Sequence, residues 1–316
     1  MKKIKILIAG IGGVGGYFGG LLANHFYNHS EVEIIFLSRG QNLLSIQQSG
    51  LKVIKGDKEL ICKPKLATDK PAEIGTVDFI IIATKTYHLQ EIVRQLEVCI
   101  NEQTIILPLL NGVDNREKIL KITPNNLVLE GCVYIISRLT EAGKIENIGN
   151  IEKLFFGIDD YQNHSEKQSK NIILLEKLFK QANIDATLST TISQVIWQKF
   201  IFISTIATAT TYFDTSIGKI LTDNEKFEIV KKLINEVTQL AKGKNITVSE
   251  DIKELTLQKL KSLPFETTSS MHFDFENKKQ NTELESLTNY VVLEGQKYNV
   301  KTPIFSKFVS EIKARK

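Results

Sequence analysis

The sequence has little of several features that mark specialised classes of protein. Its 316 residues contain only 3 cysteines and 6 prolines, with 42% hydrophobic and 24% charged residues. This composition argues against a disordered, collagen-like or low-complexity chain and is typical of a globular protein. Cys62, Cys99 and Cys132 are widely spaced and form no CxxC pair. We therefore expect three buried thiols rather than a disulfide framework.

Long apolar runs and a marked excess of one charge are also missing. No stretch approaches the roughly 18 apolar residues of a membrane-spanning helix. The formal charge is +4, without a dense block of lysine and arginine, which argues against a nucleic-acid partner. The 5 histidines lack the spacing of a zinc motif, so we expect no metal site. We interpret His88 and His272 as ordinary surface or loop residues, and the cysteine usage indicates a cytoplasmic protein.

A glycine-rich motif stands near the start of the chain. The apolar run 4–9 has the length of a strand, a helix-compatible segment covers 17–27, and 32–37 is a second apolar run. Between the first two lies G-x-G-x-x-G, in a βαβ unit of about thirty residues, which is the context of dinucleotide sites. The three glycines allow a tight turn, close approach of a pyrophosphate and close packing of the helix, whose N-terminus supplies free N–H groups. A glycine-rich loop without a ligand is the alternative. The expected cofactor-binding residues are Gly10, Ile11, Gly12, Gly13, Val14 and Gly15.

The end of the second strand indicates which cofactor binds. NAD sites usually place a carboxylate there, whereas NADP sites favour an arginine for the 2′-phosphate. Here the strand ends in Leu37-Ser38-Arg39-Gly40, without a carboxylate. Arg39 is suited to hold a phosphate with two hydrogen bonds, so we expect NADPH; a solvated surface arginine is the alternative.

The remaining first half predicts a doubly wound sheet. Lys85 follows the apolar strand 77–84, and Asn111-Gly112 follows the strand 104–110. Ligands bind at the carboxyl ends of such strands, so we expect Lys85 to contact the cofactor. Asn111 either faces substrate or nicotinamide, or belongs to an ordinary turn.

Further elements divide the chain into two domains. We expect a hairpin over 51–62, strands at 127–130 and 154–157 that continue the sheet, a helix over 165–181 and an edge strand at 184–188. Beyond residue 190 the pattern is almost entirely helical. The prediction is α/β: an N-terminal Rossmann-type doubly wound sheet at 1–188 and an all-helical C-terminal domain at 189–316.

One charge interrupts the first long helix of the second half. Lys199 lies in the apolar run 195–203 of the expected helix 192–213. Lysine is rarely fully buried unless its charge is paired or used, and such a lysine can serve as a general acid. The alternative is a lysine whose stem covers apolar surface while its ammonium reaches water. Glu283 opens a later helix, where it could simply favour the helix dipole.

These motifs, in this order, resemble the ketopantoate reductase (2-dehydropantoate 2-reductase) family over nearly the whole chain. The matching segments are the N-terminal Ile-Ala-Gly-x-Gly-x-x-Gly, Arg39, Lys85, Asn111-Gly112, Trp197-Gln198-Lys199, Ser269-Ser270-Met271 with Asp274, Thr282-Glu283 and Thr302-Pro303. The resemblance implies NADPH-dependent reduction of ketopantoate at C2 to pantoate, in pantothenate and coenzyme A biosynthesis. It also implies that Lys199 is the general acid and Glu283 a second catalytic residue. Asn111 and Ser270 would contact the substrate, Asn111 also the nicotinamide.

The chain departs from the family pattern at several polar positions. Asparagines that are common in the family are replaced by Ile203, Ala207, Ile217 and Thr267. Three interpretations remain open: a ketopantoate reductase, a reductase of the same family for a different 2-oxoacid, and a non-catalytic NADPH-binding sensor. The amphipathic C-terminal helices could also pair in a homodimer.

Overall fold

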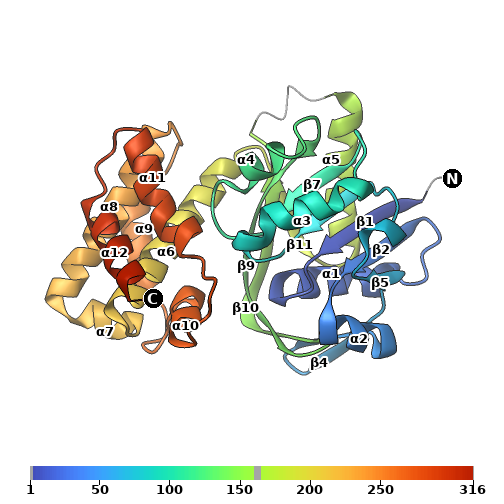
Figure 1. The fold of residues 1–316 in the computed structure, drawn as a ribbon, viewed down its shortest axis with the longest axis horizontal. Helices are drawn as coiled ribbons and strands as arrows, with labels where there is room; N and C mark the ends of the chain where they lie inside the picture. The colour runs from blue at the N-terminus through green and yellow to red at the C-terminus, as the bar shows by residue number, and fades with distance from the viewer. Residues whose placement is uncertain (1–2, 160–164, 316) are drawn as a thin grey trace. The chain divides into compact units, whose positions relative to one another are not determined.

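The computed structural model describes residues 3–159 and 165–315. The chain divides into two compact units (Figure 1). The first comprises Met1–Leu110 and Asp114–Ile192, and the second comprises Asn111–Val113 and Ser193–Lys316. The three cysteines are buried, as expected. In the described part of the chain, no helix combines the length and apolar character needed to cross a membrane.

The first unit is built on a six-stranded parallel sheet. Its order is β5-β2-β1-β6-β7-β8. The connection from β5 to β6 therefore crosses from one half of the sheet to the other, and the switch point lies between the neighbouring strands β1 and β6. Ligands of open α/β sheets bind at such a switch point. The strands are β1 (Ile4–Ala9), β2 (Val32–Leu37), β5 (Leu66–Thr68), β6 (Phe79–Ile82), β7 (Ile105–Pro108) and β8 (Leu127–Val128).

Both faces of this sheet are buried, which explains the continuous apolar runs of the sequence. Ile6 and Ile8 belong to one core cluster, whereas Leu7 and Ala9 belong to another. The helices of the unit are α1 (Gly13–Phe26), α2 (Gly40–Ser49), α3 (Leu89–Leu96), α4 (Asn115–Leu120) and α5 (Glu166–Gln181). Short 3-10 turns lie at Pro71–Glu73, Thr86–His88 and Glu97–Cys99. The predicted Rossmann-type sheet is confirmed.

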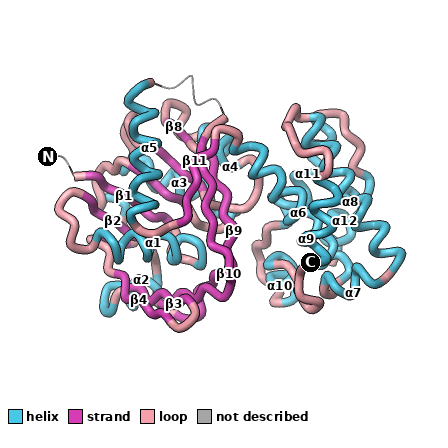
Figure 2. Tube along the Cα trace, turned by 180° about the vertical axis from the view of Figure 1, so that it is seen from behind, coloured by secondary structure: helices cyan, strands magenta, loops and turns pink. Residues whose placement is uncertain are grey.

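A second, mixed sheet was only partly predicted. Its order is β11-β10-β3-β4, with β9 paired antiparallel to β10, and Figure 2 shows β9 and β10 side by side. Its strands are β3 (Leu51–Lys55), β4 (Lys58–Cys62), β9 (Glu130–Glu141), β10 (Lys144–Gly157) and β11 (Asp185–Ser189). The predicted hairpin is β3–β4. Residues 154–157 do not continue the parallel sheet, because they lie at the end of β10. The sequence did not predict β9, since irregular pairing and outward-facing isoleucines such as Ile136 blur its alternation.

The second unit is helical, and its described residues contain no strand. Its elements are α6 (Ile192–Phe213), α7 (Ile217–Thr222), α8 (Asn224–Gly243), α9 (Ile252–Lys261), α10 (Ser270–Glu276), a π-helix (Glu285–Asn289), α11 (Tyr290–Lys297) and α12 (Pro303–Ala314). They enclose a core in which Phe200, Ile201 and Phe305 are buried. The predicted helical second half is confirmed. The surface or loop interpretation of His272 is wrong: its position on α10 leaves it only 2% exposed.

Candidate cofactor and active site

The glycine-rich turn after β1 has the geometry that the motif predicts. Gly10 has a φ of +96°, which favours glycine, and a Cβ there would lie 2.7 Å from Thr84 Cγ2. A Cβ on Gly15 would lie 2.0 Å from the carbonyl oxygen of Gly10. Only glycine therefore allows α1 to approach the end of β1 this closely.

Gly12 differs from its neighbours because its side is open. It is the N-cap of α1, and a Cβ added there would meet no atom within 4 Å. The first turn of α1 contains no acidic residue, and no side chain caps it. Free N–H groups beside open space are what a pyrophosphate requires.

Asn42, which was not predicted from the sequence, connects this turn to two other segments. Its Nδ2 donates hydrogen bonds to the carbonyl oxygen of Ile11 at 3.0 Å and to Ser38 Oγ at 3.1 Å. Its Oδ1 accepts the N–H of Gly143, from the turn between β9 and β10, at 2.8 Å. On the other side, Ser137 Oγ of β9 donates to the carbonyl oxygen of Gly13 at 3.0 Å. Side chains distant in sequence thus support the turn.

Arg39 and Lys85 lie just beyond strand ends at the same edge of the sheet. Arg39 is exposed, follows β2 and is the N-cap of α2, although its side chain makes no capping bond. Lys85 is half-buried beyond β6 and precedes the turn Thr86–His88. Gly10 packs against Thr84, next to Lys85. Both cations therefore follow strands that flank β1.

Asn111 and Lys199, which are candidate site residues from separate parts of the sequence, meet in a hydrogen bond. Asn111–Val113 follow the β7 segment but group with the helical unit. Gly112, with a φ of +98°, makes the turn. Lys199 Nζ donates to Asn111 Oδ1 at 3.0 Å. Lys199 is half-buried on α6, while the adjacent Phe200 is fully buried. The helix thus anchors the lysine on its apolar neighbours and aims its ammonium at an amide.

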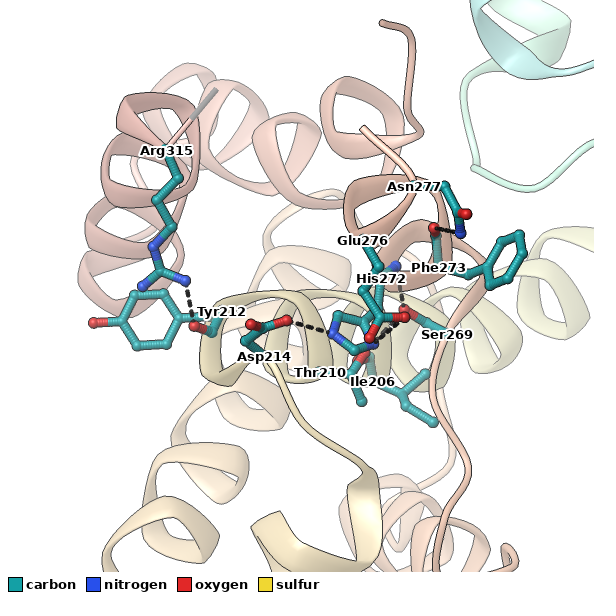
Figure 3. Close-up of polar contacts among 10 residues, drawn as sticks. All are labelled: Ile206, Thr210, Tyr212, Asp214, Ser269, His272, Phe273, Glu276, Asn277 and Arg315. Atoms are coloured by element: carbon teal, nitrogen blue, oxygen red, sulfur yellow. Dashed lines mark hydrogen bonds and ion pairs between the residues drawn. The ribbon is translucent and has the colours of Figure 1, made fainter. Parts of the chain in front are cut away.

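Ser270 is held near α6 by its neighbour. It is the exposed first residue of α10. Ser269 caps this helix by accepting the N–H of His272 at 3.0 Å, and its Oγ lies 2.9 Å from Thr210 Oγ1 of α6 (Figure 3). The helix that carries Lys199 therefore positions the segment of the predicted substrate-binding serine.

A second hydroxyl pair holds the segment of Glu283. Glu283 is 3% exposed and stands just before the π-helix; π-helical turns often occur at functional sites. Thr288 Oγ1, inside that turn, lies 2.9 Å from Thr208 Oγ1 of α6 and 4.0 Å from Met271 Sδ. The hydroxyl-rich part of α6 is visible in the sequence and could have indicated these contacts.

The positions that depart from the family pattern are structural here. Ile203 packs against the helical core, and Ala207 and Ile217 are buried in it. The N–H of Ile217 donates to the carbonyl oxygen of Thr267 at 2.8 Å. Three of these positions carry apolar side chains, and Ile217 and Thr267 are joined by a backbone hydrogen bond. An asparagine at any of them would add a side-chain amide.

Comparison with known proteins agrees with this architecture. The family "Ketopantoate reductase PanE/ApbA" matches residues 6–160, and its C-terminal counterpart matches residues 191–316. A crystal structure of 2-dehydropantoate 2-reductase from Porphyromonas gingivalis W83 is 33% identical, with a TM-score of 0.84, over 98% of this chain and 99% of that chain. The uncharacterized oxidoreductase YkpB of Bacillus subtilis (strain 168) is 26% identical over 301 residues, 95% of each protein.

A further solved structure shares the fold. D-mandelate dehydrogenase, in a ternary structure with NADH and anilino(oxo)acetate, is 21% identical with a TM-score of 0.83, over 98% of both chains. A parallel sheet with a glycine turn at its switch point, joined to a helical unit with a hydrogen-bonded lysine, defines a Rossmann-type oxidoreductase. The chain belongs to the ketopantoate reductase family.

Proposed function

We propose that this protein is an NADPH-dependent 2-dehydropantoate 2-reductase, which acts in pantothenate and coenzyme A biosynthesis in the cytoplasm. The observation that carries the proposal is the hydrogen bond of 3.0 Å between Lys199 Nζ and Asn111 Oδ1. It places a cation beside a polar amide at the positions that resemble the family's proton donor and substrate contact. A homodimer remains a prediction.

The first unit has the features that a nicotinamide dinucleotide needs. Gly12 leaves room for a pyrophosphate, and the uncapped start of α1 supplies N–H donors. Arg39 would hold the 2′-phosphate of NADPH, and Lys85 would add positive charge near the cofactor. When bound, the cofactor supplies the hydride that reduces the C2 ketone.

The residues of the second unit would handle the proton and the substrate. As the ketone oxygen of the substrate gains negative charge, the Lys199 ammonium stabilises it and then donates a proton to form the alcohol. Asn111 orients the ammonium through its amide oxygen. Ser270 would bind the substrate. The carboxylate of Glu283 would interact with the substrate and with Lys199.

A reductase for a different 2-oxoacid is the second candidate. The apolar side chains of Ile203, Ala207 and Ile217 stand where the family commonly has asparagines. D-mandelate dehydrogenase, with its aryl-bearing ligand, has the same fold. Without these amides a bound substrate has fewer hydrogen-bond partners, which favours a 2-oxoacid with fewer hydroxyl groups than ketopantoate, because an unpaired substrate hydroxyl would lose its hydrogen bond on binding.

A panel of substrates distinguishes these candidates. We expect NADPH absorbance to fall fastest with ketopantoate, compared at equal concentration with pyruvate, 2-oxoisovalerate and benzoylformate. A higher kcat/KM for another 2-oxoacid would overturn the assignment of ketopantoate as substrate, but the assignment of the protein as a reductase would stand. If no 2-oxoacid oxidises NADPH, although NADPH binds, the sensor interpretation would stand instead.

Two alanine substitutions test the glycine turn. Gly12→Ala should leave the Tm almost unchanged, because the added Cβ meets nothing, but should raise the Kd for NADPH several-fold. Gly15→Ala should lower the free energy of unfolding by about 1–3 kcal/mol, since its Cβ would overlap the Gly10 carbonyl. Thermal unfolding and fluorescence titration measure both. An unchanged Kd for Gly12→Ala would contradict the proposed pyrophosphate site.

A further inference from the structure

Ser38 lies at the end of β2 beside the glycine turn, and the proposed function gives it no role so far. Parallel pairing of β1 with β2 sets Ala9 opposite Leu37, and the N–H of Gly10 donates to the carbonyl oxygen of Leu37 at 3.2 Å. Ser38 is the next residue, and its own N–H donates to the carbonyl oxygen of Thr68 at 3.0 Å. In dinucleotide sites of this fold, the residue that recognises the 2′ position of the ribose stands at this strand end.

The side chain of Asn42 fixes the direction of the Ser38 hydroxyl. A carbonyl oxygen only accepts hydrogen bonds and a backbone N–H only donates, so the bonds to Ile11 and to Gly143 allow a single orientation of the amide. The other Nδ2 hydrogen then points to Ser38 Oγ, which lies 3.1 Å away and must accept it. Because a serine hydroxyl has one hydrogen of its own, that hydrogen is left to donate. Among the residues that the structure describes, none accepts it.

The surroundings of this hydroxyl suit an anion. Ser38 is 8% exposed, so packing holds it in place, and the adjacent Arg39 is exposed. Helix α2 begins at Gly40, has no acidic residue in its first turn and carries no side-chain cap. A Cβ added to Gly40 would meet no atom within 4 Å, which leaves room beside Arg39. A carboxylate, which NAD sites place at this strand end, would repel a phosphate, whereas a hydroxyl can donate to it.

Building on the proposed function, which assigns the 2′-phosphate of NADPH to Arg39, we propose that the Ser38 hydroxyl donates a second hydrogen bond to this phosphate. Asn42 is the positioning residue that aims the hydroxyl. Arg39 supplies charge from an exposed side chain, and Ser38 adds a donor whose direction is fixed. The same amide also holds the carbonyl oxygen of Ile11 in the glycine turn. One side chain therefore supports recognition of both the 2′-phosphate and the pyrophosphate.

Removal of the hydroxyl tests the contact with the phosphate. Ser38→Ala should raise the Kd for NADPH roughly 10-fold, the low end of the range for a hydrogen bond to a charged group. The Kd for NADH should rise less, because a bond to the neutral ribose hydroxyl is weaker. Fluorescence titration measures both values, and competition by adenosine 2′,5′-bisphosphate compared with AMP repeats the test without a nicotinamide. Equal factors for NADPH and NADH, or no change in either, would overturn the proposal.

Asn42→Asp tests the positioning role. The new carboxylate can still accept the N–H of Gly143, but it accepts the Ser38 hydrogen where the amide donated to Ser38 Oγ. The hydroxyl is then turned away from the phosphate. We expect the ratio of the Kd for NADPH to the Kd for NADH to rise at least as much as in Ser38→Ala. A residue with a merely structural role would lower the Tm and leave this ratio unchanged, and that result would refute the role of Asn42.

Ser45→Ala is the matched control. Ser45 also lies on α2, and its Oγ donates to the carbonyl oxygen of Ala142, in the same turn between β9 and β10, at 3.1 Å. Both Kd values should stay near those of wild type; the same change in ratio as in Asn42→Asp would assign the effect to the turn and refute the proposal. If Arg39→Ala weakens NADPH binding and Ser38→Ala does not, the role of Ser38 is refuted and the proposed function stands. If wild type binds no NADPH, both are refuted.

Discussion

Replacing Lys199 by methionine is expected to lower turnover by about 10²–10⁴-fold, the range for loss of a general acid. Methionine keeps much of the apolar stem beside Phe200 but removes the ammonium that donates to Asn111. Because the dinucleotide motif lies in the other unit, the Kd for NADPH should change little. Steady-state kinetics with the preferred 2-oxoacid, together with fluorescence titration of NADPH, measure both quantities.

A second lysine of the same unit provides the control for this experiment. Lys231 lies on α8, its side chain is 42% exposed, and its Nζ pairs with Glu228 Oε1 at 2.6 Å. Lys231→Met removes the same charge at the surface, so turnover should stay near that of wild type. Turnover by Lys199→Met that equals wild type would disprove the general-acid role. Partial rescue of the variant by added alkylamines would support it.

Arg39→Ala is expected to raise the Kd for NADPH by about 10–100-fold and to leave the Kd for NADH nearly unchanged. A hydrogen bond to a charged group contributes about 1.5–3 kcal/mol, which corresponds to this range. Arg39 stands at the end of β2, and its side chain does not cap α2. The helix should therefore keep its stability when the arginine is removed. Titrations of the variant with NADPH and with NADH give the ratio of the two Kd values directly.

Arg94→Ala is the matched control for Arg39→Ala. Arg94 is an exposed residue of α3 and carries the same charge, so its removal tests whether long-range attraction explains the effect. We expect the ratio of the Kd for NADPH to the Kd for NADH to be unchanged in this variant. An equal loss of affinity for both nucleotides in Arg39→Ala would disprove recognition of the 2′-phosphate.

The part of the site that the sequence predicted is the part built from neighbours in the chain. Gly10, Gly12 and Gly15 lie within one turn: the backbone conformation of Gly10 and the close packing of Gly15 require glycine, and the open side of Gly12 leaves room for the proposed pyrophosphate. Arg39 and Lys85 could be placed because they directly follow apolar strands. Asn42 could not be found in this way. Its partner Gly143 is 101 positions away, and β9 and β10 had to pair before the two met.

The second half shows the same limit. The helix 192–213 was predictable from its apolar pattern, and Lys199 was recognisable as the one charged residue in that helix. That Asn111 accepts its hydrogen bond could not be predicted, because the two residues are 88 positions apart and Asn111 leaves the sheet to join the helical unit. His272 was misplaced because α10 is only seven residues long and too short for a clear period.

The sequence by itself determined the class of fold, the glycine turn and the identity of the charged residues, since these depend on short-range patterns of side chains. The tertiary structure decided which of those residues touch. It placed Lys199 against Asn111, linked Ser269 and Thr288 to α6, and joined Asn42 to Gly143. The physical reason is that pairing of distant segments depends on how whole helices and strands bury their apolar faces, and no local pattern records that outcome.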